Sequence, residues 1–467
     1  MIWIKSSGAG CCSRFRMADS LSAELVARYA DARIPRYTSY PTAPHFSPDV
    51  GEAQYRGWLA SLGASKASLY LHIPFCRSMC WYCGCHTTVT GRKAPMLRYL
   101  DCLRQEIELV ARYRRHLLSV RHVHFGGGTP NLIPSDQMIA TMDTLRKQFR
   151  IVDGVEIAIE IDPRTFSPEM AAALGSCGFN RASIGVQSFD ADVQQAINRV
   201  QSFEQTAATV RLLRANGVRA INFDLIYGLP KQTVRSCVNT VEQALALQPD
   251  RLAVFGYAHV PSFKPHQRKM DGARLPDSEL RYDQASTIAG ALVSAGYVEI
   301  GLDHFALPDD PLARAAASGK LHRNFQGYTT DEAEILIGLG ASSIGRMPQG
   351  FVQNEVRIPE YERLVRECRL PIARGYRFAG DDRLRGAIIE RLMCDHRVDL
   401  GAICQRFGAD PTALLDETSL DPLIADGLVE QDGACITIRA HARPLVRSIA
   451  AAFDAHLPRG GIHSRAV

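Results

Sequence analysis

The chain has 467 residues, of which 13 are cysteine, and its formal net charge is +5. Its 46% of hydrophobic and 22% of charged residues exclude a disordered or fibrous chain, and the small positive charge is too weak to favour a nucleic-acid partner. The cysteines are odd in number and widely spread, which excludes a small disulfide scaffold. No apolar run approaches the roughly 20 residues of a membrane helix, and no secretory apolar core is present. We therefore expect a cytoplasmic protein without a membrane partner.

The first predicted segment, 1–65, is an N-terminal extension that leads into an arm. Helical spacing runs from Leu21 to Tyr29. The string Pro35-Arg-Tyr-Thr-Ser-Tyr-Pro-Thr-Ala43 is then predicted to be extended, because two prolines and its β-branched or aromatic residues disfavour a helix. A surface wrap with no further role is the alternative for this arm. Met17 is a second candidate start, which would make 1–16 an upstream extension.

From 66 to about 300, short apolar runs alternate with amphipathic stretches. The predicted strands are Ser68–Pro74, His122–Phe125, Glu156–Ile161, Arg181–Val186, Ala220–Ile226 and Arg251–Tyr257. The predicted helices include Met96–Tyr113, Ser135–Phe149, Phe203–Asn216, Val234–Leu247 and Ser278–Ala295. This alternation indicates an α/β fold whose parallel sheet is curved like a barrel. Ligands bind at the carboxyl ends of such strands, so the polar residues there are expected to converge on one mouth.

After about residue 300 the alternation fades. His322–Thr330 is predicted to be a loop, and Gly338–Gly345 a glycine-rich turn. The segment 376–467 is predicted to be mostly helical, with one hairpin over Gly427–Ile438. Two helices followed by a hairpin resemble a winged-helix arrangement. Because its acidic and basic residues are evenly mixed, we interpret this segment as a structural cap.

The most informative string is His72-Ile-Pro-Phe-Cys76-Arg-Ser-Met-Cys80-Trp-Tyr-Cys83-Gly-Cys85-His86. A disulfide is disfavoured in a reducing compartment. A zinc site usually needs a second ligand pair roughly 12–20 residues later, where none follows. The spacing Cys-x3-Cys-x2-Cys suits a cubane iron–sulfur cluster, because three soft thiolates leave one iron open. With Tyr82 before the third cysteine, it is the signature of radical S-adenosylmethionine (SAM) enzymes.

The whole string resembles the oxygen-independent coproporphyrinogen III oxidases, a family of radical SAM enzymes. Further motifs of this family follow in family order. They are Pro35–Ala43, Gly126-Gly-Gly-Thr-Pro130, Ile159-Glu-Ile-Asp-Pro163, Gly185-Val-Gln187, Asp224-Leu-Ile-Tyr-Gly-Leu-Pro-Lys-Gln232, Tyr257-Ala-His259 and His322-Arg-Asn-Phe-Gln-Gly-Tyr-Thr-Thr330. The resemblance implies an incomplete (β/α)6 barrel over 66–375. It also implies a closing arm within 1–65 and a cap domain over 376–467.

The resemblance further implies that Cys76, Cys80 and Cys83 ligate one [4Fe–4S] cluster and that two SAM molecules bind beside it. Cys85 is not expected to be a ligand, and a buried structural side chain is its alternative role. The residues that match the family's SAM positions are Tyr70, Tyr82, Gly127, Gly128, Thr129, Glu160, Gln187, Arg199, Asp224, Ala258 and Ile344. Glycines let backbone N–H groups approach a ligand, carboxylates accept from ammonium or hydroxyl groups, and arginine can hold a carboxylate.

The implied reaction is an oxidative decarboxylation in porphyrin and haem biosynthesis. A 5′-deoxyadenosyl radical from SAM removes hydrogen from the β-carbon of a propionate, and loss of CO2 and one electron leaves a vinyl group. Two rounds, on rings A and B, convert coproporphyrinogen III into protoporphyrinogen IX, with an electron donor and an acceptor that the sequence does not identify. No acid or base is expected. The candidates for binding or orienting the substrate are Arg36, Arg268, Lys269, His322, Arg323, Gln326 and Tyr328, and a solvated surface charge is the alternative for each basic residue.

One residue departs from the family pattern. Ser188 stands where the closest members usually carry an acidic residue, and Gln-Ser-Phe also occurs in a sister family of haem-chaperone-like radical SAM proteins. A haem-binding protein is therefore the alternative function. Cys85, the arm and the His322–Thr330 string favour the oxidase, while a radical SAM enzyme acting on RNA is disfavoured because no basic patch is present. We expect a monomer, since a capped parallel sheet needs no partner to bury it.

Overall fold

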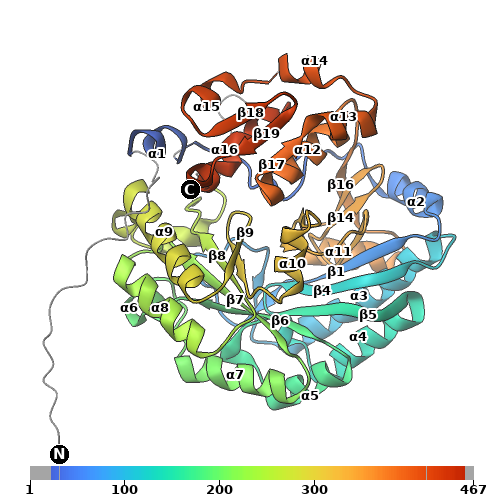
Figure 1. Cartoon of the computed structure of the whole chain (residues 1–467). Coiled ribbons are helices and arrows are strands. Elements are labelled where there is room, and N and C mark those ends of the chain that lie inside the picture. The colour runs from blue at the N-terminus through green and yellow to red at the C-terminus, as the bar shows by residue number, and fades with distance from the viewer. Residues whose placement is uncertain (1–22, 31, 417, 458–467) are drawn as a thin grey trace, which may run out of the picture.

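The computed structural model describes residues 23–30, 32–416 and 418–457, so Met17 and the first residues of the predicted N-terminal helix lie outside them. Its centre is a curved sheet of twelve strands in the order β16-β15-β14-β13-β1-β4-β5-β6-β7-β8-β10-β9. Helices lie along the outer side of this sheet, and the C-terminal domain faces the inner side (Figure 1). No helix among the described residues is long and apolar enough to span a membrane.

The six predicted parallel strands are all present. They are β1 (Lys66–Ile73), β4 (Ser119–Gly127), β5 (Arg150–Ile161), β6 (Arg181–Gln187), β7 (Ala220–Tyr227) and β8 (Arg251–Gly256). The helices between and after them are α3 (Lys93–Tyr113), α4 (Ser135–Gln148), α5 (Pro168–Ser176), α6 (Ala191–Ala196), α7 (Phe203–Ala215), α8 (Val234–Ala246) and α9 (Ser278–Ser294). The predicted incomplete barrel is confirmed. The short helices α5 and α6 were not predicted.

The region after residue 300 holds strands that were not predicted. The turn predicted over Gly338–Gly345 is present, but it joins a buried strand, β13 (Ile335–Leu339), which pairs in parallel with β1, to β14 (Ile344–Met347). The loop predicted over His322–Thr330 was wrong. The predicted loop forms the hairpin β11 (His322–Asn324) and β12 (Gly327–Thr329). Gly327 has a φ of +121°, which suits glycine after a two-residue turn. The other elements of this region are β9 (Val298–Ile300), β10 (His304–Ala306), α10 (Pro311–Ala317), β15 (Gly350–Asn354), α11 (Ile358–Arg366) and β16 (Ile372–Arg377).

The alternation of side chains along the strands separates the core from the barrel interior. In β1, Leu69 and Leu71 are buried against the outer helices, while Ser68, the residue before Leu69, lines a cavity inside the barrel. In β5, Ile159 is likewise buried in the core and Glu160 lines the cavity. Because strand side chains alternate with period 2, the apolar core and the polar interior arise from the same segments.

The C-terminal domain has a second apolar core. The elements of this domain are α12 (Asp382–Asp395), β17 (Arg397–Asp399), α13 (Leu400–Phe407), α14 (Pro411–Asp416), α15 (Asp421–Ala425), β18 (Val429–Asp432), β19 (Cys435–Ile438) and α16 (Val446–Ala450). The hairpin predicted here is confirmed as β18–β19, and β17 adds a third strand to it.

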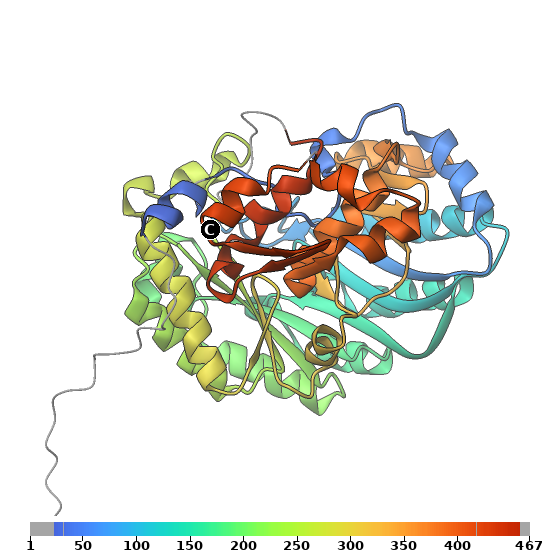
Figure 2. The same cartoon turned by 45° about the horizontal axis from the view of Figure 1, so that its top comes forward.

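The N-terminal segment divides between the two cores (Figure 2). After α1 (Ala23–Ala30), the arm is largely irregular, and its Ile34, Tyr37 and Tyr40 are buried in the C-terminal core. Helix α2 (Glu52–Ser61), which was not predicted, packs instead on the core of the barrel. The arm is therefore an internal layer between the two domains rather than a surface wrap.

Candidate active site

The cysteine string forms a loop at the carboxyl end of β1. It begins with the short strand β2 (Phe75–Cys76), which pairs with β3 (Thr88–Val89). The segment after α6 holds the middle of the loop, because Asn198 Nδ2 donates to the carbonyl of Met79 at 2.8 Å. The loop is thus fixed by the barrel as well as by contacts of its own.

A short 3-10 helix after β8, Pro265–Lys269, holds the other side of the loop. His266 Nε2 lies 2.7 Å from the carbonyl oxygen of Cys83. Gln267, which is 1% exposed, donates to the carbonyls of Tyr82 and Ala258, both at 3.2 Å. These two contact residues were not predicted. The candidate anchors that follow them, Arg268 and Lys269, are exposed.

The sulfur atom of Cys76 accepts hydrogen bonds from two threonine hydroxyls. Thr87 Oγ1 lies 3.1 Å and Thr129 Oγ1 lies 3.3 Å from Cys76 Sγ. Burial raises the pKa of the Cys76 thiol, and the two hydroxyls oppose this effect because they favour the thiolate. A sulfur surrounded by donors is suited to an anionic ligand.

Cys80 lies against two guanidinium groups. Arg164 Nη2 and Arg199 Nη1 are each 3.6 Å from Cys80 Sγ. Asp162 joins the two arginines, at 2.6 Å from Arg164 Nη2 and 3.5 Å from Arg199 Nη1. The carboxylate holds both positive groups in place beside the Cys80 sulfur.

These thiols fit an iron–sulfur cluster by their chemistry. At the third cysteine, the backbone N–H of Cys85 donates to Cys83 Sγ at 3.4 Å. Within the described part of the chain, no three His, Cys, Asp or Glu side chains gather as the ligands of a single metal ion do. In a cubane each cysteine binds a different iron, and hydrogen bonds to the sulfurs tune the cluster. Donors to all three sulfurs are therefore the observation that favours a cluster here.

The three glycines at the end of β4 allow the backbone to approach β1 and β2 closely. A Cβ atom on Gly127 would lie 2.8 Å from His72 Cε1, and one on Gly128 would lie 2.5 Å from Thr87 Oγ1 and 2.7 Å from the carbonyl oxygen of Phe75. Gly127 also has a φ of +118°, a region that favours glycine. The glycines are thus required by contact with the cysteine loop and not only by a turn.

We expect Gly128→Ala to destabilise the protein and to reduce its iron content, because the added methyl would press on the backbone of Phe75. The cost expected for such overpacking is about 1–3 kcal/mol, measurable by denaturant unfolding. Gly91→Ala is the matched control, since a Cβ there meets nothing within 4 Å. Equal stabilities for the two variants would contradict the close approach.

Two of the predicted carboxylates lie in the barrel interior. Glu160 Oε2 accepts from the backbone N–H of Gly127 at 3.0 Å, and Asp224 accepts from Ser183 Oγ at 2.8 Å and from Asn222 Nδ2 at 2.9 Å. Both line a cavity of about 190 Å³. Burial, assisted by the charge of Glu160, raises the pKa of Asp224 to about 6. The two carboxylates make their part of the cavity wall acidic and suited to a cationic ligand, although two arginine side chains also line the cavity.

The other predicted SAM positions surround the same mouth. Tyr70 Oη lies 3.0 Å from His72 Nδ1, and Arg199 donates to the carbonyl of Gly185 at 2.7 Å. Gln187, at the end of β6, has a φ of +66°. Tyr82 packs in an apolar cluster with Tyr257. Ala258 follows β8, and Ile344 begins β14.

A buried carboxylate that was not predicted fixes the turn before Ile344. Glu106 in α3 is 1% exposed and accepts from Gly340 N and Tyr361 Oη, both at 2.7 Å, and from Asn354 Nδ2 at 2.6 Å. Burial raises its pKa to about 7. The network joins a barrel helix to the β13–β14 turn, so it orders one edge of the mouth.

The substrate candidates lie at the inner side of the barrel, between the arm and the C-terminal domain. Arg36 donates to the carbonyl of Gly256 at 3.0 Å, and Arg323 donates to the carbonyl of Arg36 at 3.3 Å. The guanidinium of Arg323 lies 4.4 Å from the centre of the Tyr328 ring. Tyr328 Oη itself donates to the carbonyl of Met393 at 2.7 Å.

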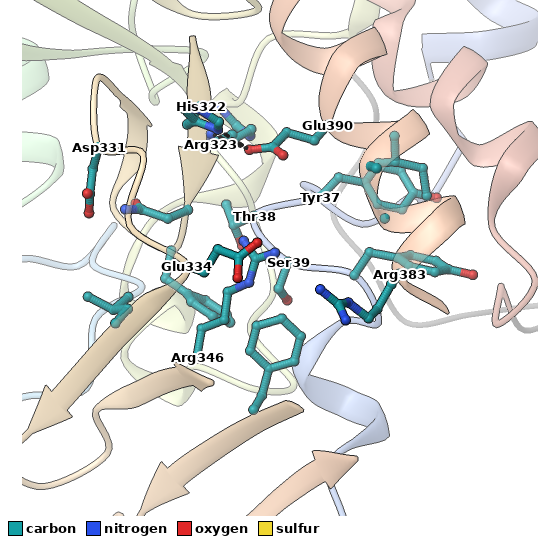
Figure 3. A pocket seen from close by; sticks show the side chains of 18 of the residues that line it. Tyr37, Thr38, Ser39, His322, Arg323, Asp331, Glu334, Arg346, Arg383 and Glu390 are labelled. Atoms are coloured by element: carbon teal, nitrogen blue, oxygen red, sulfur yellow. Dashed lines mark hydrogen bonds and ion pairs between the residues drawn. The ribbon is translucent and has the colours of Figure 1, made fainter. Parts of the chain in front are cut away.

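A pocket of about 260 Å³ lies beside this group (Figure 3). Its labelled side chains come from the arm, from strand β11 of the hairpin, from the segment between β12 and β13, from β14 and from α12. His322 Nδ1 lies 3.2 Å from Glu390 Oε1 at one end. Gln326, at the tip of the same hairpin, lines the barrel cavity instead. The hairpin thus contributes side chains to both cavities.

The chain is similar to known proteins over almost its whole length. A profile of the Radical SAM superfamily matches residues 70–244, and one of the HemN C-terminal domain matches residues 378–445. An "Oxygen-independent coproporphyrinogen III oxidase" of Bradyrhizobium diazoefficiens is 55% identical over 450 residues, which cover 96% of this chain and 100% of that protein. A protein of the same description from Paracoccus denitrificans is 42% identical, and the match covers 94% of this chain and 97% of that protein. The solved structure of the coproporphyrinogen III oxidase of Escherichia coli, described as a radical SAM enzyme, is 39% identical with a TM-score of 0.86. The match covers 91% of this chain and 100% of that chain.

Proposed function

Because the chain belongs to the oxygen-independent coproporphyrinogen III oxidases, it is a radical SAM oxidoreductase of porphyrin biosynthesis, and we propose that the residues gathered at the barrel mouth carry its reaction. The substrate is coproporphyrinogen III and the product protoporphyrinogen IX. The named relatives give no support to the haem-chaperone alternative. Ser188 is fully buried and its Oγ accepts from the backbone N–H of Asp190 at 3.2 Å, so a local structural role accounts for it.

Cys76, Cys80 and Cys83 are proposed to hold the [4Fe–4S] cluster. When bound at these cysteines, the reduced cluster would supply the one electron that cleaves SAM into methionine and the 5′-deoxyadenosyl radical needed for hydrogen removal from a substrate propionate. The chain's own residues donate to each of the three sulfurs. Thr87 and Thr129 donate to Cys76, Arg164 and Arg199 to Cys80, and the backbone N–H of Cys85 to Cys83. These donors reduce negative charge on the sulfurs and so raise the reduction potential of the site.

The SAM molecules, two by resemblance, are proposed to occupy the mouth beside the cysteine loop. Glu160 and Asp224 present carboxylates to cationic and hydroxyl groups of the ligand. Nε of Arg199, which has no hydrogen-bond partner among the described residues, is the donor proposed for a ligand carboxylate. The remaining positions in this proposal are Tyr70, Tyr82, Gly127, Gly128, Thr129, Gln187, Ala258 and Ile344. Because most of these residues are partly exposed at the mouth, a bound ligand would cover them and exclude water from a reactive radical.

Arg36, His322, Arg323, Gln326 and Tyr328 are proposed to bind or orient the substrate. Arg323 donates to the backbone carbonyl of Arg36, and the charges of both side chains act on Asp303, which supports a joint role of the two on one carboxylate. Tyr328 acts by supporting Arg323, since its hydroxyl is already bonded within the protein. We further propose that the arm within 1–65 closes over the barrel of 66–375 and that 376–467 caps it. A cytoplasmic monomer that receives electrons from a separate donor and passes them to a separate acceptor completes the proposal.

The observation that carries this assignment is the donor-surrounded cysteine loop fixed beside the acidic cavity. The test is an anaerobic assay of reconstituted protein with SAM, a reductant and coproporphyrinogen III. We expect two CO2 and two methionines for each protoporphyrinogen formed. Retention of haem without decarboxylation would favour the haem-binding alternative and overturn the proposal.

A further inference from the structure

The C-terminal helix α16 is hydrogen-bonded to the backbone of the N-terminal arm through Arg447. These two hydrogen bonds are called the grip below. Arg447 donates from Nη2 to the carbonyl of Ile34 and from Nε, at 3.1 Å, to the carbonyl of Pro35. Arg447 is only 4% exposed. A planar guanidinium can bond two successive carbonyls in a fixed geometry, which the point charge of a lysine cannot reproduce.

Two more contacts fix the arm further along. Tyr37 Oη donates to Asp454 Oδ2 at 2.9 Å, and the backbone N–H of Ala455 donates to Tyr40 Oη at 3.0 Å. The arm has almost no regular structure between α1 and α2. Its order therefore depends on these tertiary contacts, which offset the entropy of fixing its backbone.

Arg36, which follows the two residues whose carbonyls accept from Arg447, reaches the mouth of the barrel. Arg36 extends to the carbonyl of Gly256 at the end of β8, and its own carbonyl accepts from Arg323. Arg323 is 9% exposed, and its Nε and Nη1 have no hydrogen-bond partner among the described residues. A buried guanidinium with two unused donors is suited to a carboxylate ligand.

The charges around these arginines are consistent with an anion site. Asp303 is the carboxylate that both Arg36 and Arg323 affect, and the two arginines, with the hydrogen bond from His304, lower its pKa against the effect of burial. Burial and the positive charges of Arg36 and Arg323 lower the pKa of Arg447. An incoming carboxylate would relieve repulsion among the guanidiniums.

We propose that Arg447 is a positioning residue that places Arg36 beside Arg323, so that the pair binds one carboxylate of the substrate. The identity of that ligand rests on the proposed function, whereas the grip on the arm does not. Arg447 touches the backbone of the arm and acts through Arg36. The C-terminal domain is then a working part of the substrate site and not only a cap.

The grip is tested by limited trypsin digestion of the folded protein without substrate. Cleavage after Arg33 or Arg36 reports release of the arm. We expect Arg447→Lys to increase that cleavage by about tenfold or more, because lysine keeps the charge and loses the double bond to the carbonyls. Arg439→Lys is the matched control, since Arg439 makes one exposed ion pair with Glu430 in the same domain. Unchanged cleavage in Arg447→Lys would overturn the grip.

A milder variant keeps the test decisive if Arg447→Lys does not fold. Tyr37→Phe removes only the hydrogen bond to Asp454. We expect the same increase in cleavage, smaller in size, at an unchanged thermal midpoint and iron content. Protection equal to that of the unchanged protein would contradict an arm held by the C-terminal segment.

The link to the substrate is tested by fluorescence titration with coproporphyrin III, the air-stable oxidised relative of the substrate. We expect Arg36→Gln and Arg447→Lys each to weaken binding about tenfold, and the double variant to be no weaker than Arg36→Gln alone, because one residue acts through the other. Additive losses, or full affinity in Arg447→Lys with loss in Arg447→Gln, would show that Arg447 acts by its own charge and would overturn the proposal. If the unchanged protein does not bind coproporphyrin III, the proposed substrate is wrong. The trypsin digestion, which uses no substrate, would still show whether Arg447 holds the arm.

Discussion

Replacing Cys80 by alanine is expected to remove the cluster and with it all measurable turnover. Cys80 is 7% exposed and its sulfur lies against Arg164 and Arg199. Without the Cys80 sulfur, the cluster would lack one iron–sulfur bond to the protein. The two guanidiniums would also lose the negative charge that they would otherwise face. The brown absorbance and the iron content should fall together, with activity lower by at least about a hundredfold.

Two other cysteines provide the comparison. Cys368→Ser should retain colour and turnover, because Cys368 is exposed and distant in sequence from the loop. Cys85→Ala should retain iron, since Cys85 contacts the site through its backbone N–H to Cys83 Sγ. If Cys80→Ala keeps its iron while Cys85→Ala loses it, the assignment of the three ligands is wrong.

Replacing Asp224 by asparagine is expected to weaken SAM binding about tenfold to a hundredfold near pH 8, the loss typical of a charged hydrogen bond to a ligand. The carboxylate is buried and already accepts from Ser183 and Asn222, so its orientation is fixed before the ligand arrives. Because SAM carries ammonium and sulfonium groups, it favours the ionised carboxylate. Equilibrium binding of SAM to the anaerobic holoprotein measures the effect.

The same residue predicts a pH dependence. Burial raises the pKa of Asp224 to about 6, so the free enzyme loses this charge as the pH falls through that value. SAM affinity should therefore decline from about pH 8 to about pH 5 in the unchanged protein and stay nearly flat in Asp224→Asn. Asp153→Asn, at an exposed position of β5, is the control and should keep the decline. Parallel pH profiles for all three proteins would exclude Asp224 from the SAM site.

The barrel was predictable because its signals are local. In β1 and β5 apolar and polar residues alternate, and this period both identifies a strand and assigns its inner face. The cysteine spacing is likewise contained in ten residues. Strand β13 was missed because five apolar residues ending in glycines are typical of a turn as well, and only pairing with β1 makes Ile335–Leu339 a strand.

The contacts that complete the site were not predictable because they join distant parts of the chain. His266 reaches the carbonyl of Cys83 across 183 positions, and Glu106 reaches Gly340 across 234. A histidine after a strand and a glutamate within an amphipathic helix carry no local sign of such roles. Positioning residues of this kind are determined by tertiary packing, which single-sequence patterns do not contain.

The bond between Arg447 and Pro35 spans 412 positions. During synthesis the barrel strands leave the ribosome before α16 does, and domains generally fold as units from the N-terminus. A nascent chain can therefore form the cysteine loop and its acidic cavity while the arm is still unattached. The cofactor site is expected to be competent first, and the porphyrinogen site is finished only when the last part of the chain is released. Assembly order thus separates the acquisition of the cluster from access to the substrate.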